Sequence, residues 1–279
     1  MRTQVPILLY HSIAKHVAPR YRKWAVRPEM FSAQMRYLHE NGYTPMTVTE
    51  FVTTMRNRQI RLSTQPVVLT FDDGLADFYS HALPILNHYD FVATLYLTTG
   101  FIGRTSRWLS RQGEGERPML TWQQVAEISA CGVECGAHSH SHPELDILPL
   151  ALVQDELIRS KAILQERIDQ PVSSFAYPHG YYTPQVRQLV QEAGYSSACA
   201  VKHAMSSTHD DPFALARIIV ARDVDIKEFA NLLAGSHLRV APKAERQRTK
   251  VWRFVRILRQ RWRLVHFIRP VGPKRLPHR

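Results

Sequence analysis

Short apolar runs alternate with segments of helical period along the first 235 residues of the chain. The apolar runs predict buried strands, at 5–10, 66–71, 91–97, 133–137, 172–176, 197–201 and 216–220. Between them, apolar residues recur at helical spacing and predict helices, at 28–41, 77–89, 150–168, 184–193 and 225–233. Strands that alternate with helices favour a parallel sheet covered by helices.

Two capping boxes predict the starts of further helices. Thr47 with Glu50, and Thr121 with Gln124, have the spacing at which each side chain binds the backbone N–H of the other residue. The segment 104–118 is polar and contains glycine, so it predicts a loop.

The bulk composition fits a globular chain. With 279 residues, 44% of them hydrophobic, the chain can form one large α/β domain or two small ones. Three cysteines are too few for a disulfide framework. Cys131 and Cys135 have the spacing of weak metal ligands, but small buried apolar residues are the favoured interpretation. The N-terminus lacks the features of a signal peptide and no run approaches the roughly 18 apolar residues of a membrane span, so we expect a cytoplasmic protein.

The net charge of +12 belongs to one end of the chain. Residues 239–279 hold 14 of the 36 Lys and Arg residues and one of the 24 acidic residues. The rest of the chain therefore has 22 basic and 23 acidic residues and is nearly neutral. The basic character is a C-terminal appendage.

Apolar residues of this tail recur at helical spacing with arginines between them, at Val251, Phe254, Val255, Leu258, Trp262 and Val265. The pattern predicts an amphipathic helix, and residues 245–269 can lie on an anionic membrane surface. A helix that packs on the core and solvates its arginines fits the pattern equally well. Nucleic acid is not an expected partner, because no nucleic-acid-binding motif accompanies the basic residues. Three prolines predict disorder in the last ten residues, Pro270, Pro273 and Pro277.

The strand predicted at 66–71 ends at two adjacent carboxylates, Asp72 and Asp73, which Gly74 follows. Neighbouring side chains point to opposite faces of a strand, but the glycine lets the backbone turn, so both carboxylates can converge. Two carboxylates at the mouth of a buried strand are costly to desolvate unless a cation lies between them. A metal ion is the simplest such cation.

Three histidines follow the strand predicted at 133–137, namely His138, His140 and His142. Residues four apart lie on the same side of a helical turn, so His138 and His142 can bind one metal ion. A polar surface loop is the alternative interpretation. The coincidence with the two carboxylates, since both groups follow short apolar strands, favours the metal site.

These motifs resemble those of the polysaccharide deacetylase family (NodB-homology, carbohydrate esterase family 4). The segment 70–74 reads T-F-D-D-G, as in the family, and 138–143 matches H-[S/T]-x-x-H-P. A third motif appears at 175–180, which reads F-A-Y-P-H-G. The resemblance covers roughly residues 5–235 and implies an α/β fold, a distorted (β/α)7-type barrel with its site at the carboxyl ends of the strands.

The resemblance implies a role for each motif residue. Asp73, His138 and His142 would ligate one divalent metal ion, with zinc the expected ion. Asp72 would be the general base, and the backbone N–H of His179 would stabilise the oxyanion. The chemistry suits these residue types, because a metal acidifies water and polarises a carbonyl while a nearby carboxylate accepts the proton.

The chain departs from the common family pattern in two places. The third motif often begins Phe-Arg, whose arginine orients the base, but Ala176 stands here and Arg217 or Arg222 would have to substitute. His237 matches the late leucine-histidine motif poorly. A permuted branch, which includes poly-N-acetylglucosamine deacetylases, combines Phe-Ala-Tyr-Pro with Tyr-His after the first strand. Both features occur here, so we predict His11 as the general acid, against the alternative of a structural histidine that caps the strand.

The sequence therefore predicts a polysaccharide deacetylase catalytic domain over 1–236 and a basic amphipathic tail over 237–279. The predicted function is metal-dependent hydrolysis of the N-acetyl group of an amino sugar, in a glycan or a lipid-linked saccharide, with release of acetate. The expected cytoplasmic location and the basic tail together predict a substrate at the inner face of the membrane. A non-catalytic glycan-binding module of the same fold and an amidohydrolase of a small non-sugar amide are the alternatives.

Overall fold

The computed structural model of the chain describes residues 4–57, 62–236, 238 and 249–258. The chain divides into two units, 1–241 and 242–279. Candidate acid His237, residues 239–248 and residues 259–279 lie outside the described residues.

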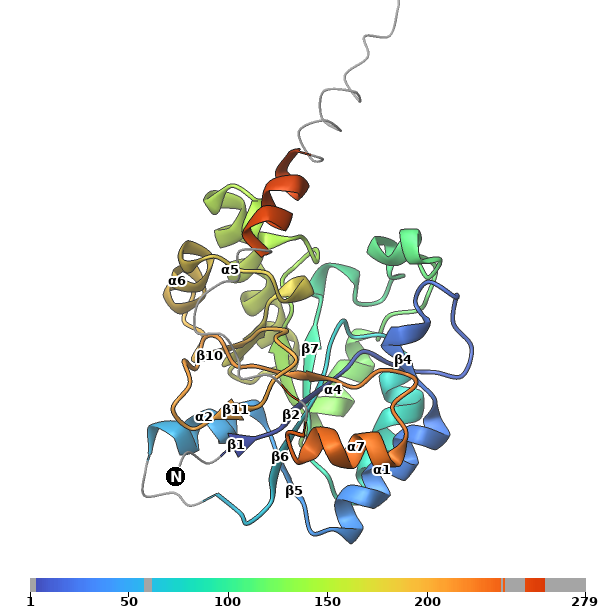
Figure 1. Cartoon of the computed structure of the whole chain (residues 1–279). Coiled ribbons are helices and arrows are strands. Elements are labelled where there is room, and N and C mark those ends of the chain that lie inside the picture. Colours follow the sequence, from blue (N-terminus) through green and yellow to red (C-terminus); the bar gives the residue numbers. More distant parts are fainter. Residues whose placement is uncertain (1–3, 58–61, 237, 239–248, 259–279) are drawn as a thin grey trace, which may run out of the picture. The chain divides into compact units, whose positions relative to one another are not determined.

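One curled parallel sheet forms the centre of the first unit (Figure 1). Its strand order is β10-β9-β8-β7-β6-β2-β12, and β5 pairs with the start of β6. The strands are β2 (Ile7–Tyr10), β5 (Thr44–Met46), β6 (Pro66–Phe71), β7 (Thr94–Leu97), β8 (Glu134–Ala137), β9 (Ser174–Ala176), β10 (Ser197–Cys199) and β12 (Ile218–Ile219). A parallel bridge between Leu215 and Cys199 joins the segment before β12 to β10, so the sheet curls back on itself. The predicted fold class is confirmed.

Helices surround the outside of the curled sheet (Figure 1). They are α1 (Pro28–Glu40), α2 (Val48–Arg56), α3 (Leu83–His88), α4 (Trp122–Ala130), α5 (Leu150–Ile168), α6 (Pro184–Glu192) and α7 (Ile226–Leu233). Both predicted capping boxes are present, at Thr47 and at Thr121. The helix predicted over 77–89 begins instead with a π-helical turn, Phe78–Ala82. Pro84 explains this difference, because it has no N–H to continue regular helical hydrogen bonding with the preceding turn.

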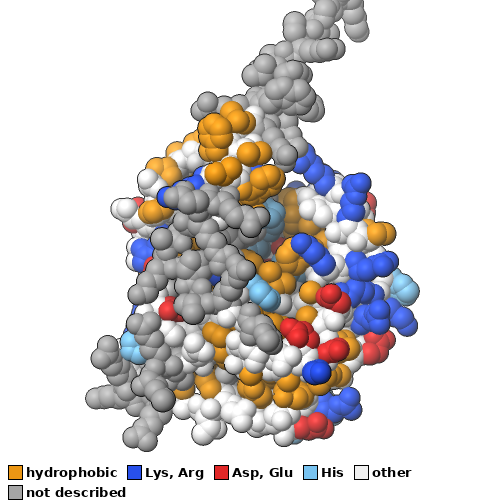
Figure 2. Space-filling model, viewed as in Figure 1, with side chains coloured by type: hydrophobic (Ala, Val, Ile, Leu, Met, Phe, Trp, Pro, Cys, Tyr) orange, Lys and Arg blue, Asp and Glu red, His pale blue; other side chains and the backbone are white. Residues whose placement is uncertain are grey.

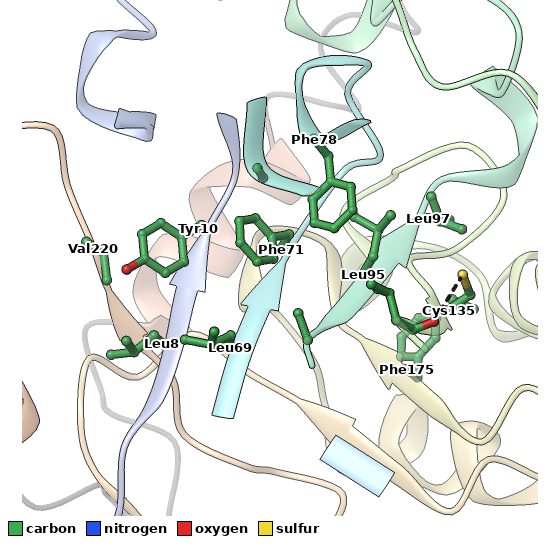
Figure 3. Close-up of a cluster of buried hydrophobic side chains, with 14 of the residues drawn as sticks. Leu8, Tyr10, Leu69, Phe71, Phe78, Leu95, Leu97, Cys135, Phe175 and Val220 are labelled. Atoms are coloured by element: carbon green, nitrogen blue, oxygen red, sulfur yellow. Dashed lines mark hydrogen bonds between the residues drawn. The ribbon is translucent and has the colours of Figure 1, made fainter. Parts of the chain in front are cut away.

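Side-chain alternation along the strands builds two layers of core. Leu8, Tyr10, Leu69, Phe71, Leu95 and Leu97 belong to the large cluster beneath the outer helices, and Figure 3 shows these side chains gathered from neighbouring strands. The residues between them in sequence fill the inside of the curl, among them Ile7, Val68 and Tyr96. Because successive side chains alternate, Asp72 and His138 share the inward parity of Val68 and Tyr96.

The Tyr96 ring fills the inside of the curled sheet and leaves no room for a side chain at the neighbouring position, Gly136. A Cβ added to Gly136 of β8 would lie 2.5 Å from the Tyr96 ring, so only glycine fits there without a shift. Glu134 and His138, two residues to either side of this glycine on β8, therefore sit below and above the tyrosine ring.

Several short elements escaped prediction. β3 (Ser12–Ile13) pairs with β4 (Ala25–Val26), and β1 (Gln4–Val5) pairs with β11 (Ser206–Ser207). The predicted loop at 104–118 contains a 3-10 turn, Arg107–Gln112. Two-residue strands are too short to show a period of two, so pattern analysis misses them.

The described part of the second unit is a helix over 249–258. Its side chains at Val251 and Phe254 are 63% and 60% exposed, and Figure 2 shows hydrophobic side chains on the surface here. Arg256 is buried. Among the described residues, no helix has both the length and the apolar character that crossing a membrane requires.

A candidate metal centre at the carboxyl ends of the strands

Parallel strands deliver the predicted site residues to one edge of the sheet. His11 follows β2, Asp72 and Asp73 follow β6, and His138 follows β8. The backbone N–H of Asp72 donates to the carbonyl of Tyr10 over 3.0 Å, which extends the β2–β6 pairing to the residues beside the site. Figure 2 shows a recess on the drawn face of the molecule with histidine side chains inside it.

Asp73, His138 and His142 form a group that could hold a metal ion. One ligand atom from each of them lies within 4.8 Å of the others. Oδ1 of Asp73 is 3.2 Å from Nε2 of His142 and 3.7 Å from Nε2 of His138. One carboxylate and two imidazoles are a donor set that suits zinc and other divalent first-row metals.

Hydrogen bonding fixes the orientation of the His138 ring. Its Nδ1 lies 2.8 Å from the carbonyl oxygen of Ala176, so Nδ1–H donates and Nε2 is left with a lone pair directed at the cluster. Burial lowers the pKa of His138 to about 4, which keeps the ring neutral. A neutral imidazole with a free Nε2 is the form that binds a metal.

Asp73 is ionised. Burial raises the pKa of this carboxyl, but the hydrogen bond and charge of His142 together with the charges of His11 and His138 outweigh burial and hold the pKa well below its usual range. Nδ1 of His142 is buried and has no hydrogen-bond partner among the described residues. The ring stacks on Trp108, with centroids 5.2 Å apart, so packing holds it in place.

The backbone around the cluster is strained. Asp73, Ser139, His142 and His179 have φ of 78°, 62°, 58° and 58°, in the left-handed region that side chains with a Cβ disfavour. Such strain persists only where the surrounding structure over-determines it, and it concentrates at functional sites. The position of Asp73 shows the effect, because the left-handed turn lets this carboxylate and Asp72 point into one site although they are adjacent in sequence.

Arg217 lies beside Asp72, the predicted base, whose arginine partner sequence analysis left open between Arg217 and Arg222. It donates two hydrogen bonds to Asp72, from Nη1 to Oδ1 over 2.6 Å and from Nη2 to Oδ2 over 2.7 Å. Both residues are buried, at 0% and 3% exposure. Burial raises the pKa of Asp72, but the charge and hydrogen bonds of Arg217 together with the charges of His138 and His11 outweigh burial, and the net shift is downward. Arg222 donates instead to backbone carbonyls at residues 14, 15 and 25.

The position of Arg217 in the sheet explains why its side chain can reach Asp72. The residue precedes β12, whose Ile218 is paired with Leu8, so its backbone lies deeper in the curl than Asp72. Its side chain runs up the inside, where Nε donates to the carbonyl of Ala200 and the guanidinium packs on the Tyr96 ring at 5.6 Å. An arginine is long enough to span this distance from below.

The remaining predicted residues lie beside the cluster. His11 feels the charges of Asp73 and Asp72, although burial has the largest effect and lowers the pKa of His11 overall. Its ring packs against Trp24, with centroids 4.8 Å apart. The His179 ring lies 4.7 Å from that of His142, in the short turn Pro178–Gly180 after β9.

Sequence analysis missed Glu156, a residue of α5 that holds the histidine loop. Its carboxylate accepts hydrogen bonds from the backbone N–H groups of His140 and Ser141, each over 2.8 Å, and from the Ser141 hydroxyl over 2.5 Å. A single glutamate on an amphipathic helix carries no sequence signal for such a contact. Cys131 and Cys135 are free thiols; Cys131 is exposed and Cys135 packs in the core, away from this group.

The sequence model of the family described as polysaccharide deacetylase matches residues 59–198. This chain belongs to that family. The match spans the segment that carries Asp72, Asp73, His138 and His142, and it confirms the predicted resemblance. The predicted enzyme class, a carbohydrate N-deacetylase, is confirmed with it.

Known proteins of the same kind cover most of the chain. A Bacillus subtilis protein, YxkH, which is named as a polysaccharide deacetylase, is 29% identical over 218 residues, covering 78% of this chain and 72% of that one. The poly-beta-1,6-N-acetyl-D-glucosamine N-deacetylase of Escherichia coli is 23% identical over 252 residues, covering 79% of this chain. The match spans only 37% of the length of the Escherichia coli protein.

Solved structures support the same fold. The Streptococcus pyogenes deacetylase PplD, determined in complex with acetate, superposes with a TM-score of 0.73 at 26% identity and covers 84% of this chain and 99% of its own. IcaB from Ammonifex degensii superposes with a TM-score of 0.69 at 23% identity, over 84% of this chain and 97% of its own, and this likeness concerns the fold alone.

Proposed function

We propose that this polysaccharide deacetylase hydrolyses the N-acetyl group of an amino sugar in a glycan or a lipid-linked saccharide, in a metal-dependent reaction. The observation that carries the proposal is that two adjacent carboxylates, Asp72 and Asp73, have different partners. Asp73 faces two imidazole nitrogens, whereas Asp72, the next residue, is held by a guanidinium. The poly-N-acetylglucosamine deacetylases among the relatives act on a glycan of this kind.

Asp73, His138 and His142 would hold the metal ion, with zinc the expected ion from the two imidazoles and one carboxylate. When bound, the metal acidifies water and polarises the acetyl carbonyl. Around that position the residues of the chain divide the other tasks among themselves.

Asp72 is the general base in this proposal. Arg217 keeps the carboxylate ionised and fixes its orientation with two hydrogen bonds, which leaves the remaining lone pairs of Asp72 to accept a proton from the attacking water. Because both partners are buried, the pair has little freedom to turn away from the site. Arg217 thus replaces the arginine that the third motif lacks at Ala176.

His11 is the proposed general acid, and the backbone N–H of His179 the proposed oxyanion donor. His11 follows the strand next to β6, so the two ends of the acid–base pair come from neighbouring strands. Packing against Trp24 holds the His11 ring beside the two carboxylates, whose charges it feels, and from there it would protonate the leaving amine. The left-handed turn at His179 directs the backbone of this residue differently from a regular strand.

Acetate release tests the proposal directly. Purified full-length protein loaded with zinc should release acetate from at least one of a panel of polymeric, lipid-linked and soluble N-acetylated sugars. The Asp72→Asn protein, which keeps the shape of the side chain, should lose activity by about 10³-fold, in the middle of the range of general-base contributions. Wild-type protein that releases no acetate from any of these sugars contradicts the proposal.

Metal content tests the ligands separately from turnover. The His138→Ala protein should retain less zinc than wild type after dialysis, and His140→Ala, in the same loop, serves as the matched control. Equal zinc in the His138→Ala and wild-type proteins means that the ligand assignment is wrong.

Association with an anionic membrane through residues 245–269 is a further part of the proposal. The exposed apolar side chains at Val251, Phe254 and Leu258 support it, since each would gain from burial in a lipid interface. Full-length protein should sediment with vesicles that contain anionic lipid, and protein lacking 245–279 should not. Equal sedimentation of the two proteins removes the tail from the proposal.

A further inference from the structure

A second pocket lies against the histidine loop, outside the candidate metal centre. Its volume is about 360 Å³. It is walled by the turn Thr99–Phe101, the start of α4, the middle of the histidine loop and one face of α5. This volume is near the lower end of the range of small-ligand sites, which matches one or two sugar units rather than a long polymer.

The charge of the pocket is strongly one-sided. Arg104, Arg159 and Arg167 line it, and Glu166 is its one acidic lining residue. The arginine–carboxylate ion pairs of the described residues involve Arg117, Arg187 and Arg217, so none neutralises a pocket arginine. Three guanidinium groups and one carboxylate in one concave site leave an excess of positive charge that is suited to an oxyanion.

The other lining residues suit a saccharide. Trp122, the first residue of α4, presents a ring that the Arg167 guanidinium already covers at 5.6 Å. Glu166 and the Thr99 hydroxyl can exchange hydrogen bonds with sugar hydroxyls. A flat aromatic surface with a few polar groups fixes the orientation of a small ligand.

The pocket and the candidate metal centre share a wall. His140 lines the pocket and bonds to the Thr99 hydroxyl through Nδ1 over 3.0 Å. It stands two residues from His138 and two from His142, so the backbones of both proposed ligands are within about 7 Å of its own. A saccharide that passes the loop can therefore contact both sites.

We propose that this arginine pocket binds an anionic group, a phosphate ester or a carboxylate, carried by the N-acetylated saccharide substrate. The inference rests on the proposed deacetylase function and narrows its substrate class to anionic saccharides. The pocket selects the substrate and takes no part in breaking the amide bond.

Matched substrates test the inference. Three N-acetylated oligosaccharides that differ only in bearing a phosphate, a carboxylate or neither are compared by KM and kcat. Wild type should have the lowest KM for one of the anionic substrates, and the preferred one identifies the group. Replacing Arg104, Arg159 and Arg167 together by Gln should raise that KM about 10-fold or more, with kcat and the KM of the neutral substrate unchanged.

Two single variants sharpen the experiment. Arg36→Gln removes an exposed arginine of α1, away from the pocket, and should change no KM. Glu166→Gln removes the opposing charge and should lower the KM of the anionic substrate. Wild type that treats all three substrates alike, or a triple variant with unchanged KM, overturns the inference while leaving deacetylation intact.

Direct binding separates failure of the pocket from failure of the proposed function. The probe is N-acetylglucosamine 1-phosphate, titrated calorimetrically into full-length protein with a chelator present, so that no metal can ligate the phosphate. Binding by wild type and the Arg36→Gln protein, and its loss in the triple variant, supports the pocket even if no substrate is deacetylated. Equal binding by the wild-type and triple-variant proteins overturns the inference.

Discussion

The two ends of β8 contrast a half-buried carboxylate whose hydrogen bonds are satisfied with a buried imidazole that faces two carboxylates. Glu134 begins the strand, and neutral donors satisfy it: the Thr49 backbone and hydroxyl over 3.1 and 2.7 Å, and the Thr94 and Ser174 hydroxyls over 2.8 and 2.5 Å. His138 follows the strand at the other end and faces Asp72 and Asp73 at 3.8 and 3.7 Å. Both side chains point inside the same sheet.

The difference lies in whether the local polar groups satisfy one another. Around Glu134 each hydroxyl donates to the carboxylate, and none of these residues has a left-handed backbone. Around His138 the imidazole lone pair meets carboxylate oxygens, which are also acceptors, and left-handed residues hold them together. Acceptors that converge in this way are stabilised by a cation between them.

The largest expected effect comes from breaking the ion pair between Arg217 and Asp72, beside the candidate metal centre. Arg217→Met leaves the buried Asp72 carboxylate unpaired and should lower the free energy of unfolding by about 3–5 kcal/mol. Urea unfolding monitored by circular dichroism measures this, provided that the slope of the transition is unchanged.

A double-mutant cycle supplies the control. Neutralising the partner as well, in Asp72→Asn with Arg217→Met, should recover part of the lost stability, because no buried charge is then left alone. If Arg217→Met is no more destabilising than the double variant, the pair does not have the energetic role that its geometry suggests.

The second prediction concerns the cation itself. Zinc at 100 times its dissociation constant should stabilise the folded protein by about 2.7 kcal/mol, seen as a rise in the melting temperature. His142→Ala should abolish the rise, whereas Glu134→Gln should keep it although it alters a carboxylate on β8. A rise of the same size in the His142→Ala protein would falsify the proposed ligand set.

The sequence predicted which residues gather at the candidate metal centre better than it predicted the residues that support them. Asp72, Asp73, His138 and His142 could be placed together because each follows a strand whose apolar run is readable, and parallel strands end at one edge. Arg217 could be proposed but not distinguished from Arg222, since its reach depends on how the segment before β12 closes the curl. Such closure arises from tertiary packing and leaves no local pattern.

The third prediction concerns Glu134, at the start of β8. Glu134→Gln turns one acceptor oxygen into a donor that faces hydroxyl and amide donors, so it should cost about 2 kcal/mol of stability. The kcat and the zinc-induced rise in melting temperature should be unchanged. A large fall in kcat would break the comparison, because it would make this end of the strand part of the chemistry.

The smallest expected effect concerns Glu156 of α5, which holds the histidine loop beside the candidate metal centre. Its carboxylate holds the backbone of His140 and Ser141, between the two proposed histidine ligands. Glu156→Ala frees this loop and should weaken zinc affinity about 10-fold, equivalent to about 1.4 kcal/mol, as loss of an outer-shell support does. Asp155→Ala, the neighbouring exposed acid on α5, should change zinc affinity little. If the two variants lose the same zinc affinity, the negative charge of α5 explains the effect and the hydrogen bonds of Glu156 do not. The histidine loop would then be held by its own backbone.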